Sequence, residues 1–197
     1  MLPRCAVRVL GITGSPRHGG NTEQLLNEVM KGAASKGAET KIIFLNTLKV
    51  KPCQECGGCD KTGECIVKDD MQMVYEELRQ ADRIVLASPL FFMGVTAQLK
   101  GMMDRCQALW VRKYRLKTPP LVEKKERKGL FISVGGRDVP HLFDGALQAV
   151  DSWFAVLNIK RAGNLLYPGI DDKGDILKHP EALQEAFEAG EKLVEDA

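Results

Sequence analysis

The segment from Gly14 to Thr22 gathers hydroxyl groups, glycines and one arginine between an apolar run and an amphipathic helical pattern. A glycine-rich turn from a strand into a helix presents backbone N–H groups and the positive end of the helix dipole, which together favour an anion. Ser15 and Thr22 add hydroxyl donors, Arg17 adds a planar cation suited to phosphate, and Asn21 is placed to cap the helix. The spacing fits neither a dinucleotide loop nor a nucleoside-triphosphate loop. The sequence therefore predicts a phosphate-monoester site rather than a plain connection.

A second segment is rich in thiols, with the spacing C-x-x-C-x-x-C-x5-C formed by Cys53, Cys56, Cys59 and Cys65. Three cysteines at successive two-residue gaps wrap a short loop around a compact group, as bacterial ferredoxin loops do around a cubane cluster. The usual zinc pattern separates two C-x-x-C pairs by a dozen or more residues. The spacing favours a [4Fe–4S] cluster, and the alternatives are a zinc ion or thiols that hold no metal. Cys5 and Cys106, in an expected strand and helix, are interpreted as packing residues.

The elements around these segments alternate between apolar runs and helical patterns. Five buried strands are expected at residues 6–10, 41–45, 83–88, 129–134 and 159–166, with about five helices between and after them. This alternation is typical of a doubly wound α/β parallel sheet. The loops after the first, third and fourth strands have an unusual composition, and they are expected to converge at the carboxyl edge of the sheet.

The phosphate segment resembles the NADPH-dependent FMN reductases. The motif G-S-P-R-x-x-G-N-T spans Gly14 to Thr22, residues 88–91 read S-P-L-F, and residues 99–105 read L-K-G-M-M-D-R, as in that family. The resemblance implies a flavodoxin-like five-stranded sheet of order 2-1-3-4-5 and a site for FMN at its switch point. It also implies a flavin-dependent oxidoreductase with NAD(P)H as a possible electron donor.

The resemblance also suggests which residues hold the flavin. An isoalloxazine ring needs an apolar wall and backbone that can approach closely, and the loops after the third and fourth strands supply both. The alternative for residues 89–94 is a buried extension of the strand. Arg137 is expected near the carbonyl edge of the ring, with an exposed loop arginine as the alternative. The full candidate set is Ser15, Pro16, Arg17, Asn21, Thr22, Pro89, Leu90, Phe91, Phe92, Gly94, Ser133, Gly135, Gly136 and Arg137.

A compact cysteine loop after the second strand of such a domain resembles the iron–sulfur flavoproteins of anaerobic archaea and bacteria. That resemblance implies that Cys53, Cys56, Cys59 and Cys65 bind a [4Fe–4S] cluster close to FMN. It further implies a homodimer or homotetramer with FMN at the interface. Related reductases keep a similar loop and are described without a cluster, so an occupied loop and an empty one both remain open.

Length and charge restrict the remaining possibilities. The chain has 197 residues and a net charge of +2, so we expect one domain that binds neither nucleic acid nor membrane. Within it we expect a Cys-rich insertion at about 50–68 and a basic excursion at about 110–128. The excursion is interpreted as a solvated face, or as a contact for an acidic ferredoxin-like carrier or another subunit. With no export signal and six cysteines, the expected location is the cytoplasm.

Three functions are consistent with these residues. The leading hypothesis is an FMN protein that transfers electrons through an adjacent [4Fe–4S] cluster. The second is an NAD(P)H-dependent FMN, quinone or nitro reductase without a cluster. The third is a redox-sensing or zinc-stabilised module whose cysteine loop switches an interaction. No side chain is expected to act as a nucleophile or an acid–base catalyst, because the cofactors carry the chemistry.

Overall fold

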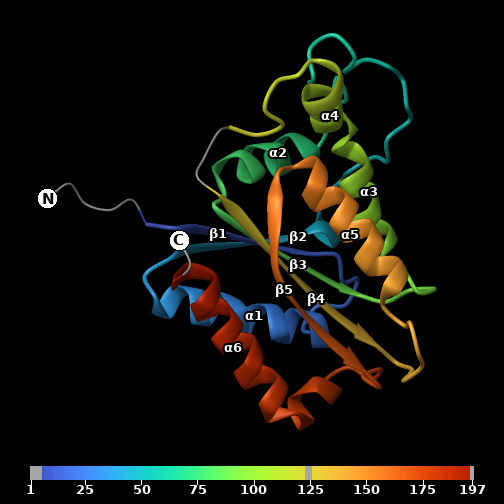
Figure 1. The fold of residues 1–197 in the computed structure, drawn as a ribbon. Helices are drawn as coiled ribbons and strands as arrows, with labels where there is room; N and C mark the ends of the chain where they lie inside the picture. Colours follow the sequence, from blue (N-terminus) through green and yellow to red (C-terminus); the bar gives the residue numbers. More distant parts are fainter. Residues whose placement is uncertain (1–5, 123–125, 196–197) are drawn as a thin grey trace, which may run out of the picture.

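The computed structural model describes residues 6–122 and 126–195. Its centre is a five-stranded parallel sheet in the order β2-β1-β3-β4-β5 (Figure 1), which confirms the expected flavodoxin-like order. The first strand begins and ends later in the chain than predicted, and the others lie close to their predicted positions. The strands are β1 (Arg8–Thr13), β2 (Glu39–Phe44), β3 (Arg83–Pro89), β4 (Arg127–Gly135) and β5 (Ile159–Pro168).

Helices cover both faces of the sheet (Figure 1). The helices α1 (Asn21–Ser35) and α6 (Pro180–Glu195) pack on one face. The other face carries α2 (Met71–Gln80), α3 (Ala97–Arg105) and α5 (Asp144–Val156). The short helix α4 (Gln107–Trp110) and the π-helical turn η2 (Val111–Arg115) follow α3, while the 3-10 turns η1 (Leu45–Thr47) and η3 (Asp175–Lys178) lie in loops. Among the described helices, none has the length and apolar character needed to cross a membrane.

The strand β3 shows why both faces must be covered. Ile84 and Leu86 contribute to the core under α2, α3 and α5, while Val85 and Ala87 contribute to the core under α1 and α6. Successive side chains of a strand point to opposite faces, so a continuous apolar run makes both faces apolar. The run at 83–88 therefore specifies a central strand between two helix layers.

The position of α1 matters because its first turn borders the phosphate segment. A Cβ atom on Gly32 would lie 1.9 Å from the Phe187 carbonyl oxygen, and one on Gly190 would lie 2.0 Å from the Val29 carbonyl oxygen. Only glycine lets the backbones of α1 and α6 approach this closely. These contacts fix α1 against α6, and so fix where the start of α1 lies.

The segment expected as a basic excursion partly packs on the cysteine loop. Arg115 Nη1 lies 2.8 Å from Asp60 Oδ1, and a Cβ atom on Gly63 would lie 2.2 Å from Arg112 Cγ. Figure 1 shows the teal cysteine loop beside α4, where this contact forms. The described part of the excursion is therefore not a solvated face alone, because its first arginines cover the loop. Residues 123–125 of the excursion lie outside the described residues.

Candidate functional site

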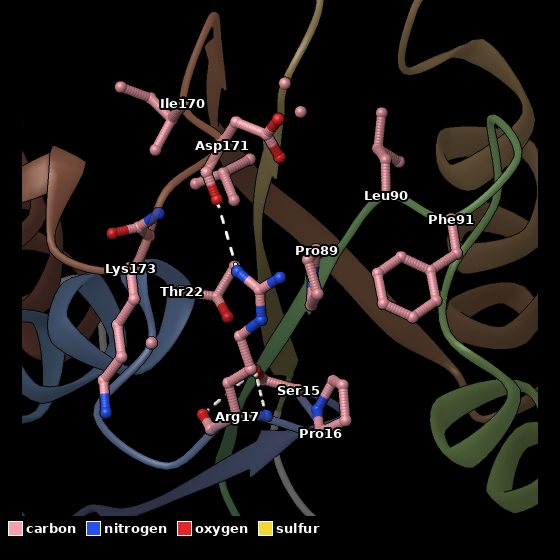
Figure 2. Close-up of a pocket in the computed structure, with 15 residues that line it drawn as sticks. Ser15, Pro16, Arg17, Thr22, Pro89, Leu90, Phe91, Ile170, Asp171 and Lys173 are labelled. Atoms are coloured by element: carbon pink, nitrogen blue, oxygen red, sulfur yellow. Dashed lines mark hydrogen bonds between the residues drawn. The ribbon is translucent and has the colours of Figure 1, made fainter.

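A pocket lies at the carboxyl ends of the strands, where the loops after β1, β3, β4 and β5 meet (Figure 2). The first three of these loops are the ones expected to converge there. Many of the predicted flavin residues line the pocket together: Ser15, Pro16, Arg17, Asn21, Thr22, Pro89, Leu90, Phe91, Gly135 and Gly136. Residues that were predicted from three separate loops thus lie together in the structure.

The turn between β1 and α1, where the sequence predicts a phosphate site, forms one end of the pocket. The Ser15 hydroxyl accepts a hydrogen bond from the Arg17 amide at 3.2 Å, which folds the turn back on itself. The Gly19 amide donates to Glu23 Oε2 at 2.9 Å, within the first turn of the helix. The helix begins at Asn21; the Glu23 and Gln24 amides donate to the Gly20 carbonyl at 3.0 Å, whereas the Asn21 and Thr22 amides precede the first hydrogen bond of the helix. With the buried Thr22 hydroxyl beside them, these amides can receive an anion.

Arg17 lies across the mouth of this pocket. Its side chain is exposed, and Nη1 donates to the backbone oxygen of Asp171 at 3.3 Å. Figure 2 shows the guanidinium between the phosphate turn and Asp171. A neutral carbonyl oxygen is a weaker partner for a guanidinium than a phosphate, so a bound phosphate can take over these N–H groups.

Asn21 does not cap α1, contrary to expectation. The N-cap residue is Gly20, and no side chain caps it. The Asn21 amide instead donates through Nδ2 to the Asp172 carbonyl at 2.8 Å, and its Oδ1 accepts from the Gly174 amide at 2.9 Å. Asn21 is already the first helical residue, so its side chain is free to hold the loop after β5 against the pocket.

That loop supplies pocket residues that the sequence analysis missed, namely Ile170, Asp171 and Lys173. The ammonium of Lys173 lies near the phosphate turn, since a Cβ atom on Gly19 would be 3.6 Å from Lys173 Nζ. The available signal was the Asp-Asp-Lys-Gly turn directly after the last strand, at the carboxyl edge where ligands of such sheets bind.

Four predicted flavin residues, Phe92, Gly94, Ser133 and Arg137, are not among those that line the pocket. Ser133 is buried and donates from Oγ to the Ser88 carbonyl at 2.8 Å, so it joins β4 to β3. Arg137 is exposed, and its position near the flavin ring stays a prediction that the midpoint potential of Arg137→Ala would test.

Phe92 and Gly94 belong to a tight turn beside the pocket. The Phe91 and Gly94 backbones exchange hydrogen bonds of 3.0 and 3.1 Å, and between them Phe92 and Met93 have φ angles of 51° and 64°. Large side chains rarely adopt this left-handed region, and such strain is concentrated at functional sites. The turn presents exposed apolar side chains next to the pocket, with Phe92 fully exposed.

The four predicted metal ligands line a second cavity of about 200 Å³, together with Arg105 and Arg115. Cys53 and Cys56 are exposed, while Cys59 and Cys65 are half-buried. Within residues 6–122 and 126–195, no three His, Cys, Asp or Glu side chains are drawn together closely enough to hold a metal ion. The thiols therefore face a common cavity without converging on one point.

The residues around this cavity fit an iron–sulfur cluster in type and charge. Gly57 and Gly63 have φ angles of 69° and 67°, which allows the two tight turns between the thiols. The Gly63 amide donates to the Cys59 carbonyl at 2.8 Å, so it is not free to face a sulfide. Burial, followed by the nearby Asp60 carboxylate, raises the pKa of the Cys59 thiol. A cationic iron centre would offset both effects, because it favours the thiolate.

A buried ion pair closes the base of the same loop. Arg105 Nη1 lies 2.7 Å from Asp69 Oδ2, and both side chains are almost fully buried. Burial would raise the pKa of Asp69, but hydrogen bonds from Arg105 and from the Lys51 amide hold that pKa below its usual value. Burial would likewise lower the pKa of Arg105, but hydrogen bonds to Asp69 and Cys65 raise it. Both groups therefore stay charged at neutral pH.

The remaining cysteine of the described chain lies in the core. Cys106 is buried, and burial raises the pKa of its thiol to about 12. This agrees with the interpretation of Cys106 as a packing residue. Cys5 lies outside the described residues. The pocket and the thiol cavity share no lining residue, so within one chain the two sites are separate.

Comparison with known proteins gives a family match over most of the chain. The family model described as NADPH-dependent FMN reductase matches residues 7–161. An iron-sulfur flavoprotein of Methanosarcina thermophila is 35% identical over 66% of this chain and 64% of its own length. One from Archaeoglobus fulgidus is 41% identical over 65% of this chain and 62% of its own length. The match thus spans less than two thirds of each of these relatives.

Among solved structures, an NAD(P)H:quinone oxidoreductase from Methanothermobacter marburgensis superimposes with a TM-score of 0.72. The alignment covers 96% of this chain and 100% of the other, at 19% sequence identity. At this identity the likeness supports the fold alone, and it agrees with the strand order found above.

Proposed function

Because the chain belongs to the NADPH-dependent FMN reductase family, we propose that it is an FMN-dependent oxidoreductase that passes electrons between a reductant and an acceptor. The observation that carries the proposal is the pocket at the strand ends. One side of it offers Arg17, Thr22 and the start of α1 to an anion, and the other offers Leu90 and Phe91 to an apolar ring. This pairing of an anion site with an apolar wall suits a flavin phosphate.

The chain's own residues would bind and orient the flavin. Arg17 and the first amides of α1 hold the phosphate, and Lys173 adds a second positive charge nearby. Gly136 packs closely against the loop after β5, since a Cβ atom there would lie 2.8 Å from Asp171 Cγ. FMN, when bound, supplies hydride and single-electron transfer.

We further propose that Cys53, Cys56, Cys59 and Cys65 bind a [4Fe–4S] cluster. Four soft thiol donors line one cavity, and the buried Arg105 beside it donates a hydrogen bond to Cys65 Sγ at 3.3 Å. The names of the relatives from Methanosarcina thermophila and Archaeoglobus fulgidus support this proposal. Such a centre would let the protein join two-electron flavin chemistry to one-electron carriers.

The proposed partners follow from the same surfaces. The electron donor is a ferredoxin-like carrier or NAD(P)H. We propose a homodimer or homotetramer, because Phe91, Phe92 and Met93 are exposed on a strained turn beside the flavin pocket, and exposed apolar surface of this kind is typical of a subunit interface. We also propose that the chain forms a single domain and is located in the cytoplasm.

The deciding experiment measures flavin, iron, acid-labile sulfide and zinc in protein purified without oxygen. We expect one FMN, four irons and four sulfides per chain, by the stoichiometry of the proposed cofactors. A Cys56→Ser, Cys59→Ser double variant should lose iron and sulfide but keep FMN, because its substitutions lie outside the flavin pocket. Protein without flavin would refute the function as a whole. FMN with neither iron nor sulfide would refute the cluster alone.

A second candidate is an NAD(P)H-dependent FMN, quinone or nitro reductase without a cluster. It is favoured by the lack of convergence of the thiols and by the separation of the two sites within one chain. Its test is stopped-flow reduction of the flavin by NADPH in protein from which iron has been removed. Rapid reduction there, with turnover of quinones unchanged, would favour this candidate. Zinc in the loop together with negligible turnover would instead favour a redox-sensing or zinc-stabilised module.

A further inference from the structure

The side chain of Arg105 sits at the end of α3 and is directed at the cysteine loop. Arg105 is only 2% exposed. Its Nη1 donates to Asp69 Oδ2 at 2.7 Å and to the Lys51 carbonyl at 2.8 Å. Its Nη2 donates to Asp69 Oδ1 at 3.1 Å and to Cys65 Sγ at 3.3 Å. The cysteine loop therefore packs around a buried guanidinium.

These contacts join the two ends of the loop. Lys51 precedes the first thiol, at Cys53, while Cys65 is the last thiol and Asp69 follows it. Asp69 strengthens the same junction, because its Oδ2 also accepts from the Lys51 amide at 2.9 Å. The segment that carries all four thiols is thus closed at its base by one ion pair.

The guanidinium also places a positive charge against one thiol in particular. Among the four cysteines, Cys65 is the one to which a hydrogen bond from Arg105 is seen in the described structure. Hydrogen bonds and positive charges at a ligating sulfur stabilise the more negative, reduced state of a cluster and so raise its potential. Arg115 also lines the cavity, but it is exposed and paired with Asp60, so solvent screens its charge.

We propose that Arg105 is a positioning residue for the cluster, which holds the cysteine loop closed and raises the cluster potential through its contact with Cys65. This inference rests on the proposed cluster. It assigns to one buried arginine both the preorganisation of the loop and part of the tuning of the metal centre. The two roles are separable, because the first needs the planar fork of the guanidinium and the second needs only its charge.

The test compares Arg105→Gln, which removes both charge and fork, with Arg105→Lys, which keeps the charge. The matched control is Arg127→Gln, since Arg127 is also buried and donates to backbone carbonyls, those of Ala81 and Arg79, away from the cysteine loop. Each protein is purified without oxygen. Three quantities are measured: the midpoint potential of the cluster, the amide hydrogen exchange of residues 52–68 after iron removal, and the thermal unfolding midpoint.

We expect Arg105→Gln to lower the cluster potential and to accelerate amide exchange in residues 52–68 by at least about a hundredfold, the factor that corresponds to the loss of a buried ion pair. Arg105→Lys should accelerate amide exchange as well, because one ammonium cannot reach all the groups that the guanidinium contacts. The cluster potential of Arg105→Lys should stay close to the wild-type value, because the positive charge is kept. Arg127→Gln should lower the thermal unfolding midpoint without changing the cluster potential or the amide exchange of residues 52–68. If Arg105→Gln unfolds, Arg105→Lys still tests the exchange prediction.

Two results would overturn the inference while leaving the proposed function intact. One is a cluster with unchanged potential and unchanged loop exchange in Arg105→Gln. The other is an Arg127→Gln control that alters both loop measurements as strongly, which would reveal a general loss of stability. A wild-type protein that binds FMN but no iron would refute the cluster and with it the tuning of the potential. The closing role of Arg105 would then be judged by amide exchange, and unchanged exchange would overturn that role too.

Discussion

Replacing Arg17 with glutamine should weaken the binding of FMN far more than the binding of riboflavin. In the structure, Arg17 Nη1 donates to the Asp171 carbonyl at 3.3 Å, and a phosphate would replace that neutral acceptor with an anionic one. A hydrogen bond to a charged group contributes about 1.5–3 kcal/mol. Because Arg17 is exposed and part of its interaction is screened, we expect a loss of about 1–2 kcal/mol, or about 5–30-fold in Kd.

The assay is titration of flavin-free protein with FMN and with riboflavin, followed by quenching of flavin fluorescence. Riboflavin lacks the phosphate, so its Kd should change little in Arg17→Gln. The matched control is Lys31→Gln, which removes one positive charge from α1 at the end away from the pocket, where Lys31 pairs with Glu28 at 2.6 Å. Raising the salt concentration should narrow the difference between wild type and Arg17→Gln for FMN alone.

Two outcomes would contradict this reasoning. An equal loss for FMN and riboflavin would mean that Arg17 supports the shape of the pocket rather than the phosphate. An unchanged Kd for FMN would mean that the start of α1 and Lys173 hold the phosphate without Arg17. In either case the turn after β1 would need another explanation for an arginine at its centre.

Three further predictions concern stability. Gly32→Ala should destabilise the chain by about 3 kcal/mol, because its methyl group would lie 1.9 Å from the Phe187 carbonyl oxygen. Gly101→Ala should stabilise the chain by about 0.5–1 kcal/mol, because its methyl group would meet no atom within 4 Å and alanine favours the helix. Urea unfolding measures both changes. Between pH 9 and about 12 the free energy of unfolding should fall more steeply in wild type than in Cys106→Ala, by about 1 kcal/mol per pH unit, because the unfolded chain releases the Cys106 thiol proton first while burial keeps the folded pKa of that thiol at about 12. Phe92→Gly should raise the unfolding midpoint of the flavin-free chain, since glycine relieves about 1 kcal/mol of strain at a φ of 51°; an unchanged or lower midpoint would contradict that strain.

The architecture could be predicted because its signal is local and repeated. The apolar runs at 83–88 and 129–134 lie in β3 and β4, and each is long enough to require cover on both faces. The strand ends differ from the ends of the apolar runs, and β1 extends to Thr13 because the parallel pairing with β2 and β3 continues past the run. The pairing partners decide where a strand ends, and a single run does not contain them.

The candidate flavin residues could be predicted where one loop contains the whole signal. Ser15, Arg17 and Thr22 lie in one turn, so their types and spacing are enough to predict an anion site there. Asp171 and Lys173 were missed because their loop joins the pocket through contacts that span most of the chain, those of Asn21 with residues 172 and 174 and that of Arg17 with Asp171. The same long-range contacts explain why Asn21 does not act as a helix cap.

For the cysteine loop, too, one part of the site could be predicted from the sequence and another part could not. Its spacing identified four donors that do line one cavity, although the thiols do not converge on a single point. The spacing said nothing about Arg105, which reaches the loop from the far end of α3 and closes it with Asp69. The resemblance to L-K-x-x-x-D-R placed this arginine at the end of a helix, and its buried partners are visible only in the folded chain.

The sequence by itself determined the alternation of strands and helices, the glycine-rich turn proposed to bind an anion and the spacing of the four thiols, because each of these depends on residues close together in the chain. Tertiary structure alone decided which loops meet. It brought Lys173 to the phosphate turn, Arg115 to Asp60 and Arg105 to Cys65, and it kept the flavin pocket and the thiol cavity apart within one chain. The physical reason is that such contacts join residues from distant segments, and their geometry exists only after the two helix layers have closed over the sheet.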